Sequence, residues 1–149
     1  MGMSLMTTLR VFTNESGKCG NPVGIIIDES LHFNKNERLQ MALDSGFSEV
    51  VFIDNIKERN ISIFSPHGEI PFAGHAAVGS AYFLNHKFKI PVTQLSCMKT
   101  LIDSWLENDL TWVRGNLSVL PIWNYEQLFS AAQVDKVTQK GAAMKKHTV

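Results

Sequence analysis

Two short stretches of the sequence carry side chains that could together move a proton. Residues 46–52 place one carboxylate, Glu49, beside an apolar run. Residues 65–75 pass from a predicted strand through a turn into a predicted helix that opens with Gly74 and His75. Free N–H groups and the helix dipole attract an anion at such a helix start. An acid beside it suits proton transfer on a small carboxylated molecule.

Glu49 is the predicted general acid/base. It follows Phe47 and Ser48 and precedes Val50, so we expect a desolvated carboxyl group. Desolvation favours the neutral form and raises the carboxyl pKa toward the working pH, where the group can remove a proton from carbon and return it elsewhere. The residues alone leave a second interpretation open, a strand-edge glutamate in water.

His75 is the second predicted catalytic residue. At a helix start its ring could orient a substrate or share a proton. A histidine beside alanines is also typical of a satisfied core residue, and that alternative stays open from the residues alone. Gly74 would let a ligand approach the backbone closely, and Ser48 could donate its hydroxyl to the substrate.

Apolar and β-branched runs predict the strands that position these residues. The predicted strands are residues 9–13, 23–27, 48–53, 61–64, 95–105 and 110–114, and the last two form a hairpin. Residues 23–27 are continuously apolar, which predicts a strand buried on both faces.

Three helices are predicted. Asn34 and Glu37 form a capping-box pattern before a helix over residues 35–45, whose apolar side is Leu39, Ala42 and Leu43. The helix over residues 74–85 has no charged face, so we expect the sheet to enclose it. Asn124 could cap a last helix over residues 125–134, before a polar tail. Together these elements predict an α+β fold, a mixed sheet or barrel wrapped around a central helix.

Five motifs in this order resemble the phenazine-biosynthesis isomerase (PhzF-like) family, which has the diaminopimelate epimerase-like fold. They are VFT at residues 11–13, GNPV at 20–23, FSEVVF at 47–52, FSP at 64–66 and EIPFAGHAAVG at 69–79. The resemblance covers about residues 5 to 134. It implies Glu49 and His75 as catalytic residues and Ser48, Gly74 and Ala76 as substrate-binding residues.

The resemblance also implies two lobes, each a strand barrel around a central helix, with the substrate in the cleft between them. Family members are near twice this length, and this chain resembles the N-terminal lobe. We therefore predict one lobe over residues 1–134 and a polar, frayed tail over residues 135–149. The second lobe supplies the family's cleft with an aspartate and backbone donors, for which this chain shows no candidate.

The predicted function is that of a PhzF-like isomerase that acts by acid/base proton transfer on a small carboxylated metabolite. A second lobe, or a homodimer that mimics the family's internal twofold, would complete the site. The alternative is a truncated, non-catalytic lobe that serves as a binding or interaction module. A paired-thiol epimerase is disfavoured because no cysteine stands at the start of the 74–85 helix.

The amino-acid composition limits the classes of partner that we expect this protein to bind. The 149 residues include 14 lysines and arginines and 14 aspartates and glutamates, a balance that argues against nucleic-acid and membrane partners. No secretory signal is recognisable, so we expect a cytoplasmic protein. Cys19 and Cys97 show no metal-ligand spacing and are predicted to be free thiols. We expect neither a metal nor a cofactor.

Overall fold

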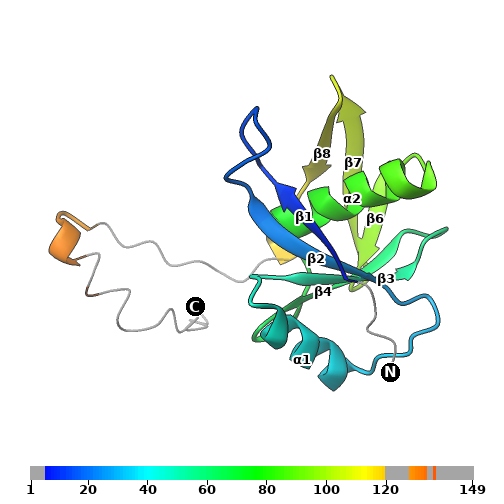
Figure 1. Cartoon of the computed structure of the whole chain (residues 1–149), viewed down its shortest axis with the longest axis horizontal. Helices are drawn as coiled ribbons and strands as arrows, with labels where there is room; N and C mark the ends of the chain where they lie inside the picture. The colour runs from blue at the N-terminus through cyan, green and yellow to red at the C-terminus, as the bar shows by residue number, and fades with distance from the viewer. Residues whose placement is uncertain (1–5, 120–127, 134–135, 137–149) are drawn as a thin grey trace. The chain divides into compact units, whose positions relative to one another are not determined.

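The computed structural model describes residues 6–119, 128–133 and 136. The chain divides into two compact units, residues 1–119 and 120–149, and the first contains all the labelled elements of Figure 1. The helices and strands of the first unit are β1 (Thr7–Val11), β2 (Asn21–Ile27), α1 (Lys35–Ser45), β3 (Val50–Asn55), β4 (Asn60–Ser65), β5 (Gly68–Ile70), α2 (Gly74–Phe88), β6 (Gln94–Cys97), β7 (Thr100–Glu107) and β8 (Leu110–Arg114), followed by a 3-10 helix (Leu117–Val119).

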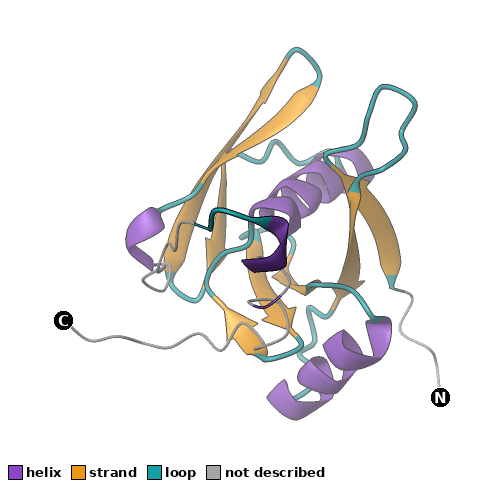
Figure 2. Ribbon diagram, turned by 90° about the vertical axis from the view of Figure 1, so that its left-hand side faces the viewer, coloured by secondary structure: helices purple, strands orange, loops and turns teal. Residues whose placement is uncertain are grey.

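The strands form one mixed sheet that curls around α2. Its order is β1-β2-β3-β4-β6-β7-β8, and β5 pairs with β4. The β2–β3 and β4–β6 pairs are parallel and the others are antiparallel. Both edge strands, β1 and β8, contact α2, and strands lie on either side of this helix (Figure 2). The predicted α+β architecture, a sheet wrapped around a central helix, is confirmed.

Strand β3 separates two apolar cores, because successive side chains of a strand point to opposite faces. Val51 and Ile53 join the core between the sheet and α2, where the small residues of α2 allow close packing. Val50 and Phe52 join a second core beneath α1. Residues of β2 are likewise buried from Val23 to Ile26, so this strand is covered on both faces as predicted.

The start of α1 agrees with its predicted capping box. The Asn34 side chain accepts hydrogen bonds from the backbone N–H groups of Asn36 and Glu37, and the Glu37 carboxylate accepts one from Asn34 N–H at 2.8 Å. The predicted apolar side is wrong at Leu43, which is exposed. Its place on the buried face is taken by Arg38, one turn before Ala42.

The predicted strand over residues 95–105 is two strands. Met98 and Lys99 both adopt left-handed backbone conformations, with φ of 46° and 64°, and turn β7 back antiparallel to β6. Similarly, β1 ends at Val11 and not at residue 13, because Phe12 has a φ of 60°. Helix α2 continues to Phe88, three residues beyond its predicted end.

Parts of the predicted C-terminal helix and tail lie outside the described residues. The prediction is wrong for residues 128–130, which are not helical, whereas residues 131–133 and 136 are helical. Residues 125–127 and 134 of the predicted helix, the lobe boundary at residue 134 and all of the predicted tail except residue 136 are not among the described residues. Those parts stay predictions.

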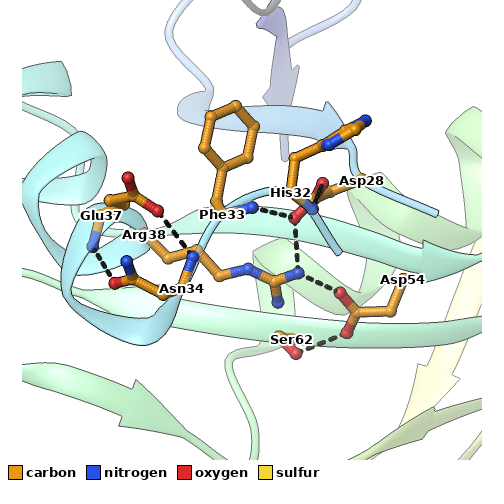
Figure 3. Close-up of polar contacts among 8 residues, drawn as sticks. All are labelled: Asp28, His32, Phe33, Asn34, Glu37, Arg38, Asp54 and Ser62. Carbon is orange, nitrogen blue, oxygen red and sulfur yellow. Dashed lines mark hydrogen bonds and ion pairs between the residues drawn. The ribbon is translucent and has the colours of Figure 1, made fainter. Parts of the chain in front are cut away.

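Arg38 joins α1 to the sheet through two carboxylates (Figure 3). Its Nη2 atom lies 2.7 Å from Asp28 Oδ2 and 2.7 Å from Asp54 Oδ1. Asp28 also accepts from the His32 backbone N–H, and the Ser62 hydroxyl donates to Asp54 at 2.6 Å. Burial alone would lower the pKa of Arg38, but its hydrogen bonds to Asp54 and Asp28 raise it. The guanidinium therefore stays charged inside the protein.

Candidate active site

The acid and the histidine singled out in the sequence lie side by side. Glu49 comes directly before β3, and His75 is the second residue of α2. Glu49 Oε2 lies 2.9 Å from His75 Nε2, and the two side chains are 16% and 10% exposed, respectively. The curled sheet thus brings a largely shielded carboxylate to the amino end of its enclosed helix.

Ser48 completes a group of three polar side chains. Its Oγ lies 3.4 Å from His75 Nε2, the same nitrogen that contacts Glu49. This nitrogen can carry only one hydrogen, and the contact with Glu49 is the shorter of the two. Ser48 is exposed, so its hydroxyl is also accessible to a ligand from solvent.

The start of α2 is open. Its N-cap residue, Ala73, makes no side-chain hydrogen bond to the first turn. A Cβ atom built on Gly74 would have no neighbour within 4 Å among the described atoms. The Ala76 side chain is fully buried in the core between the sheet and α2, so only its backbone N–H could contact a ligand. First-turn N–H groups with free space before them can bind an anion.

The predicted direction of the pKa shift of Glu49 is wrong. The hydrogen bond with His75 has the largest effect and lowers the pKa of Glu49 below its ordinary value. Desolvation raises it, as the sequence predicted, but is the smaller effect, and a hydrogen bond from Ser48 lowers it further. Glu49 is therefore held as the carboxylate, the form that acts as a base.

His75→Gln is expected to raise the pKa of Glu49, because the substitution removes the largest cause of its lowering. A pKa lowered by folding stabilises the folded state above the unfolded pKa, and this stabilisation is lost as the pH falls through the folded pKa. The variant should therefore lose less stability on acidification than the wild type. A ¹³C NMR titration of the Glu49 carboxyl measures the shift directly. Ser48→Ala should give a smaller rise, and identical titrations of wild type and His75→Gln would contradict the assignment.

The other chemistry-bearing residues lie apart from this group. Glu69 pairs with Lys35 at 3.2 Å, and His67 is exposed in the β4–β5 turn. Cys19 and Cys97 are free thiols, as predicted, and burial raises the pKa of Cys97 to about 12. Within residues 6–119, 128–133 and 136, no cluster of three or more His, Cys, Asp or Glu side chains could hold a metal ion. No helix in that part of the chain is long and apolar enough to cross a membrane.

The family model for phenazine biosynthesis-like protein matches residues 9–102. The chain belongs to this family.

Curated proteins similar in sequence to this chain support its place in the family over about half of its length. An uncharacterized isomerase of Mesorhizobium japonicum is 41% identical over 78 residues, which cover 50% of this chain and 25% of the relative. An uncharacterized isomerase of Pasteurella multocida is 32% identical over 80 residues, which cover 51% of this chain and 27% of the relative. The chain therefore matches only about a quarter of the length of these curated relatives.

Solved structures share the fold. The PhzF-family protein of Bacillus anthracis aligns with a TM-score of 0.58 at 23% identity, over 72% of this chain and 38% of that one. A predicted epimerase from Pseudomonas aeruginosa aligns with a TM-score of 0.54 at 21% identity, over 72% of this chain and 40% of that one. In both structures the likeness covers less than half of the neighbour.

Proposed function

We propose that this chain is a PhzF-like isomerase lobe that transfers a proton on a small carboxylated metabolite by acid/base chemistry of its own side chains. The observation that carries the proposal is the 2.9 Å contact between Glu49 and His75 at the open start of α2. A base and an anion-binding helix start then lie within reach of one small molecule.

Each residue of the group has a role in this proposal. The substrate carboxylate accepts hydrogen bonds from the first-turn N–H groups of Gly74, His75 and Ala76. Glu49, held as the carboxylate by His75, removes a proton from a carbon next to that carboxylate. His75 orients Glu49 and can share the proton, and Ser48 donates its hydroxyl to the substrate.

A second lobe, or a partner in a homodimer, would close this site. Ser48 is exposed and the space before Gly74 is open among the described atoms, so a further lobe or a partner has access to this end of the group. In the two solved structures the aligned part covers 38% and 40% of the chain, so each chain is about two and a half times the aligned length, which is room for a further lobe. Two free thiols suit a reducing compartment, so we place the protein in the cytoplasm.

The short match to the relatives also favours a second candidate function. A chain whose matched part covers about a quarter of its curated relatives could be a non-catalytic lobe that binds small carboxylates or a partner protein. In this candidate function the start of α2 binds an anion, and no reaction is catalysed.

Exchange with solvent deuterium separates the two functions. The full chain is incubated in D₂O with a panel of small carboxylic acids that carry a C–H bond next to the carboxyl or to a double bond. Mass spectrometry then measures deuterium in the recovered acids. Incorporation above the protein-free rate supports the isomerase. Saturable binding of an acid without deuterium incorporation would contradict the proposed isomerase function and support the non-catalytic binding lobe.

Gly74→Ala is expected to weaken carboxylate binding at least about tenfold, because its methyl group would occupy the open space where the ligand approaches. Its free energy of unfolding should change by no more than about 0.5 kcal/mol, since the added Cβ meets no described atom. Isothermal titration calorimetry and urea unfolding measure the two effects.

The matched control is Gly79→Ala in the same helix. There a Cβ would lie 3.0 Å from Val23 Cγ1 and 3.3 Å from Val11 Cγ2. Overpacking should lower the free energy of unfolding by about 1–3 kcal/mol, with binding by the folded fraction unchanged. Unchanged binding by Gly74→Ala would mean that no ligand approaches this end of α2.

A further inference from the structure

A hollow lies on the face of the sheet that carries α1, opposite the face that packs on α2. Its volume is about 310 Å³. It is bordered by the first turn of α1, by the segment before that helix and by β5. We call it the α1–β5 hollow, and its principal lining residues are the apolar Leu31, Phe33 and Phe64 and the charged Lys35, Arg38 and Glu69.

We propose that the α1–β5 hollow binds a free α-amino acid with an apolar side chain, in its dipolar form. The charged side chains that line the hollow are two cations, Lys35 and Arg38, and two anions, Asp54 and Glu69. A ligand with one positive and one negative group can find an opposite charge for each and adds no net charge to this set. A volume of about 310 Å³ is at the small end of the range of about 300–1,000 Å³ that is usual for ligand sites, which suits a molecule of this size.

The Lys35–Glu69 ion pair has a spacing similar to that of the ligand's own charges. Lys35 Nζ lies 3.2 Å from Glu69 Oε2. The ammonium and carboxylate of an α-amino acid are attached to the same carbon, so their charged atoms are about 3 Å apart. The ligand can therefore lie antiparallel to the ion pair, with its carboxylate against Lys35 and its ammonium against Glu69. Lys35 Nζ carries three hydrogens, and Glu69 Oε1 makes no hydrogen bond within the described part of the chain, so both groups can take a further partner.

Arg38 supplies a further donor from within the protein. Its side chain is 8% exposed, and Nη2 is the nitrogen that contacts Asp28 and Asp54. Nη1 makes no hydrogen bond with the residues that the structure describes, and in Figure 3 it points away from Asp28. Asp28 is not among the lining residues of the hollow, whereas Asp54 and Ser62 are. The hydrogens of Nη1 therefore lie on the side of the hollow, where a carboxylate can accept them in a charge-assisted hydrogen bond.

The apolar lining of the hollow suits an apolar side chain on the ligand. Phe64 is buried, Phe33 is half-buried and Leu31 is exposed. The rings of Phe33 and Phe64 both pack edge-on against the buried ring of Phe52, which holds them in place. A ligand side chain that covers Leu31 and the Phe33 ring would remove apolar surface from water. This inference is independent of the proposed proton transfer, because α2 lies on the other face of the sheet.

A ¹H–¹⁵N NMR titration of the full chain with leucine tests the proposal. The amide signals of Ser62, Phe64 and Glu69 should shift saturably, with a Kd below about 5 mM. N-acetyl-leucine lacks the ammonium and leucinamide lacks the carboxylate, so each should bind at least about tenfold more weakly than leucine. Glycine has the same two charges and no side chain, and it should also bind more weakly than leucine.

Two variants of the chain test the ion pair. Lys35→Met and Glu69→Gln each remove one charge that the ligand would contact, and each should weaken leucine binding at least about threefold. The matched control is Lys18→Met, because Lys18 is exposed in the loop between β1 and β2 and does not line the hollow. This control should bind leucine as the wild type does. Circular dichroism checks that all three variants fold.

Any of four results would overturn the proposal. The first is the absence of saturable shifts at Ser62, Phe64 and Glu69 with a Kd below about 5 mM. The second is equal binding of leucine and N-acetyl-leucine, which would show that the ammonium group is not recognised. The third is wild-type binding of leucine by either Lys35→Met or Glu69→Gln. The fourth is a set of leucine-dependent shifts confined to residues 74–76, which would place the ligand at the start of α2 instead.

Discussion

Glu49→Gln is expected to slow deuterium incorporation into the substrate by about 10²–10⁴-fold, the usual contribution of a positioned acid/base group. Glutamine has nearly the same shape as glutamate, so its contact with His75 can persist while its ability to take a proton is lost. The pKa of Glu49 is lowered in the wild type, so the base form predominates near neutral pH. Rates of incorporation measured by mass spectrometry in D₂O, for wild type and variant, give the effect.

Glu15→Gln is the matched control for this loss. Glu15 is exposed in the loop between β1 and β2. Its substitution makes the same change in net charge and should leave the rate of incorporation unchanged. Near-wild-type incorporation by Glu49→Gln, with its circular dichroism spectrum intact, would place the base elsewhere.

Arg38→Met is expected to lower the free energy of unfolding by about 3–5 kcal/mol, the usual cost of removing one partner of a buried ion pair. Asp28 is 1% exposed and Asp54 is 19% exposed, so both carboxylates would lose their shared counter-charge with little access to water. Methionine also loses the contact of the guanidinium with the Phe52 ring, 4.7 Å from its centroid. Urea unfolding followed by circular dichroism measures the change.

Lys35→Met is the control on the same helix. The Lys35 side chain is 70% exposed and pairs with Glu69 at 3.2 Å, so its loss should cost less than about 1 kcal/mol. Arg38→Lys should lower the free energy of unfolding by an intermediate amount. It keeps the positive charge but loses the planar guanidinium that reaches two carboxylates. If Arg38→Met costs no more than Lys35→Met, the buried cluster adds no net stability.

Local sequence patterns were sufficient for most of the fold. The capping box of α1 depends on neighbouring residues and was predicted correctly at Asn34 and Glu37. The β6–β7 turn was missed because Met98 and Lys99 are not residues that favour turns, and Met98 extends an apolar run. The buried place of Arg38 was missed because it depends on Asp28 and Asp54, which only the folded sheet brings near.

For the candidate site, the sequence predicted the residues but not the direction of the pKa shift of Glu49. The motifs identified Glu49, His75 and Ser48, and the fold brings these three side chains together. The sequence also suggested desolvation of Glu49, which is present but smaller than the effect of His75. The direction of the shift depends on a contact between distant parts of the chain, so neighbouring residues could not give it.

The measurement that tests the central claim most directly is a ¹H–¹⁵N NMR titration of the chain with small carboxylates such as acetate, pyruvate and benzoate. The amide signals of Gly74, His75 and Ala76 should shift saturably with at least one of them, and Gly74→Ala should weaken that binding. If no carboxylate moves these three signals, or if saturable shifts occur only on other elements, the start of α2 is not where the substrate binds.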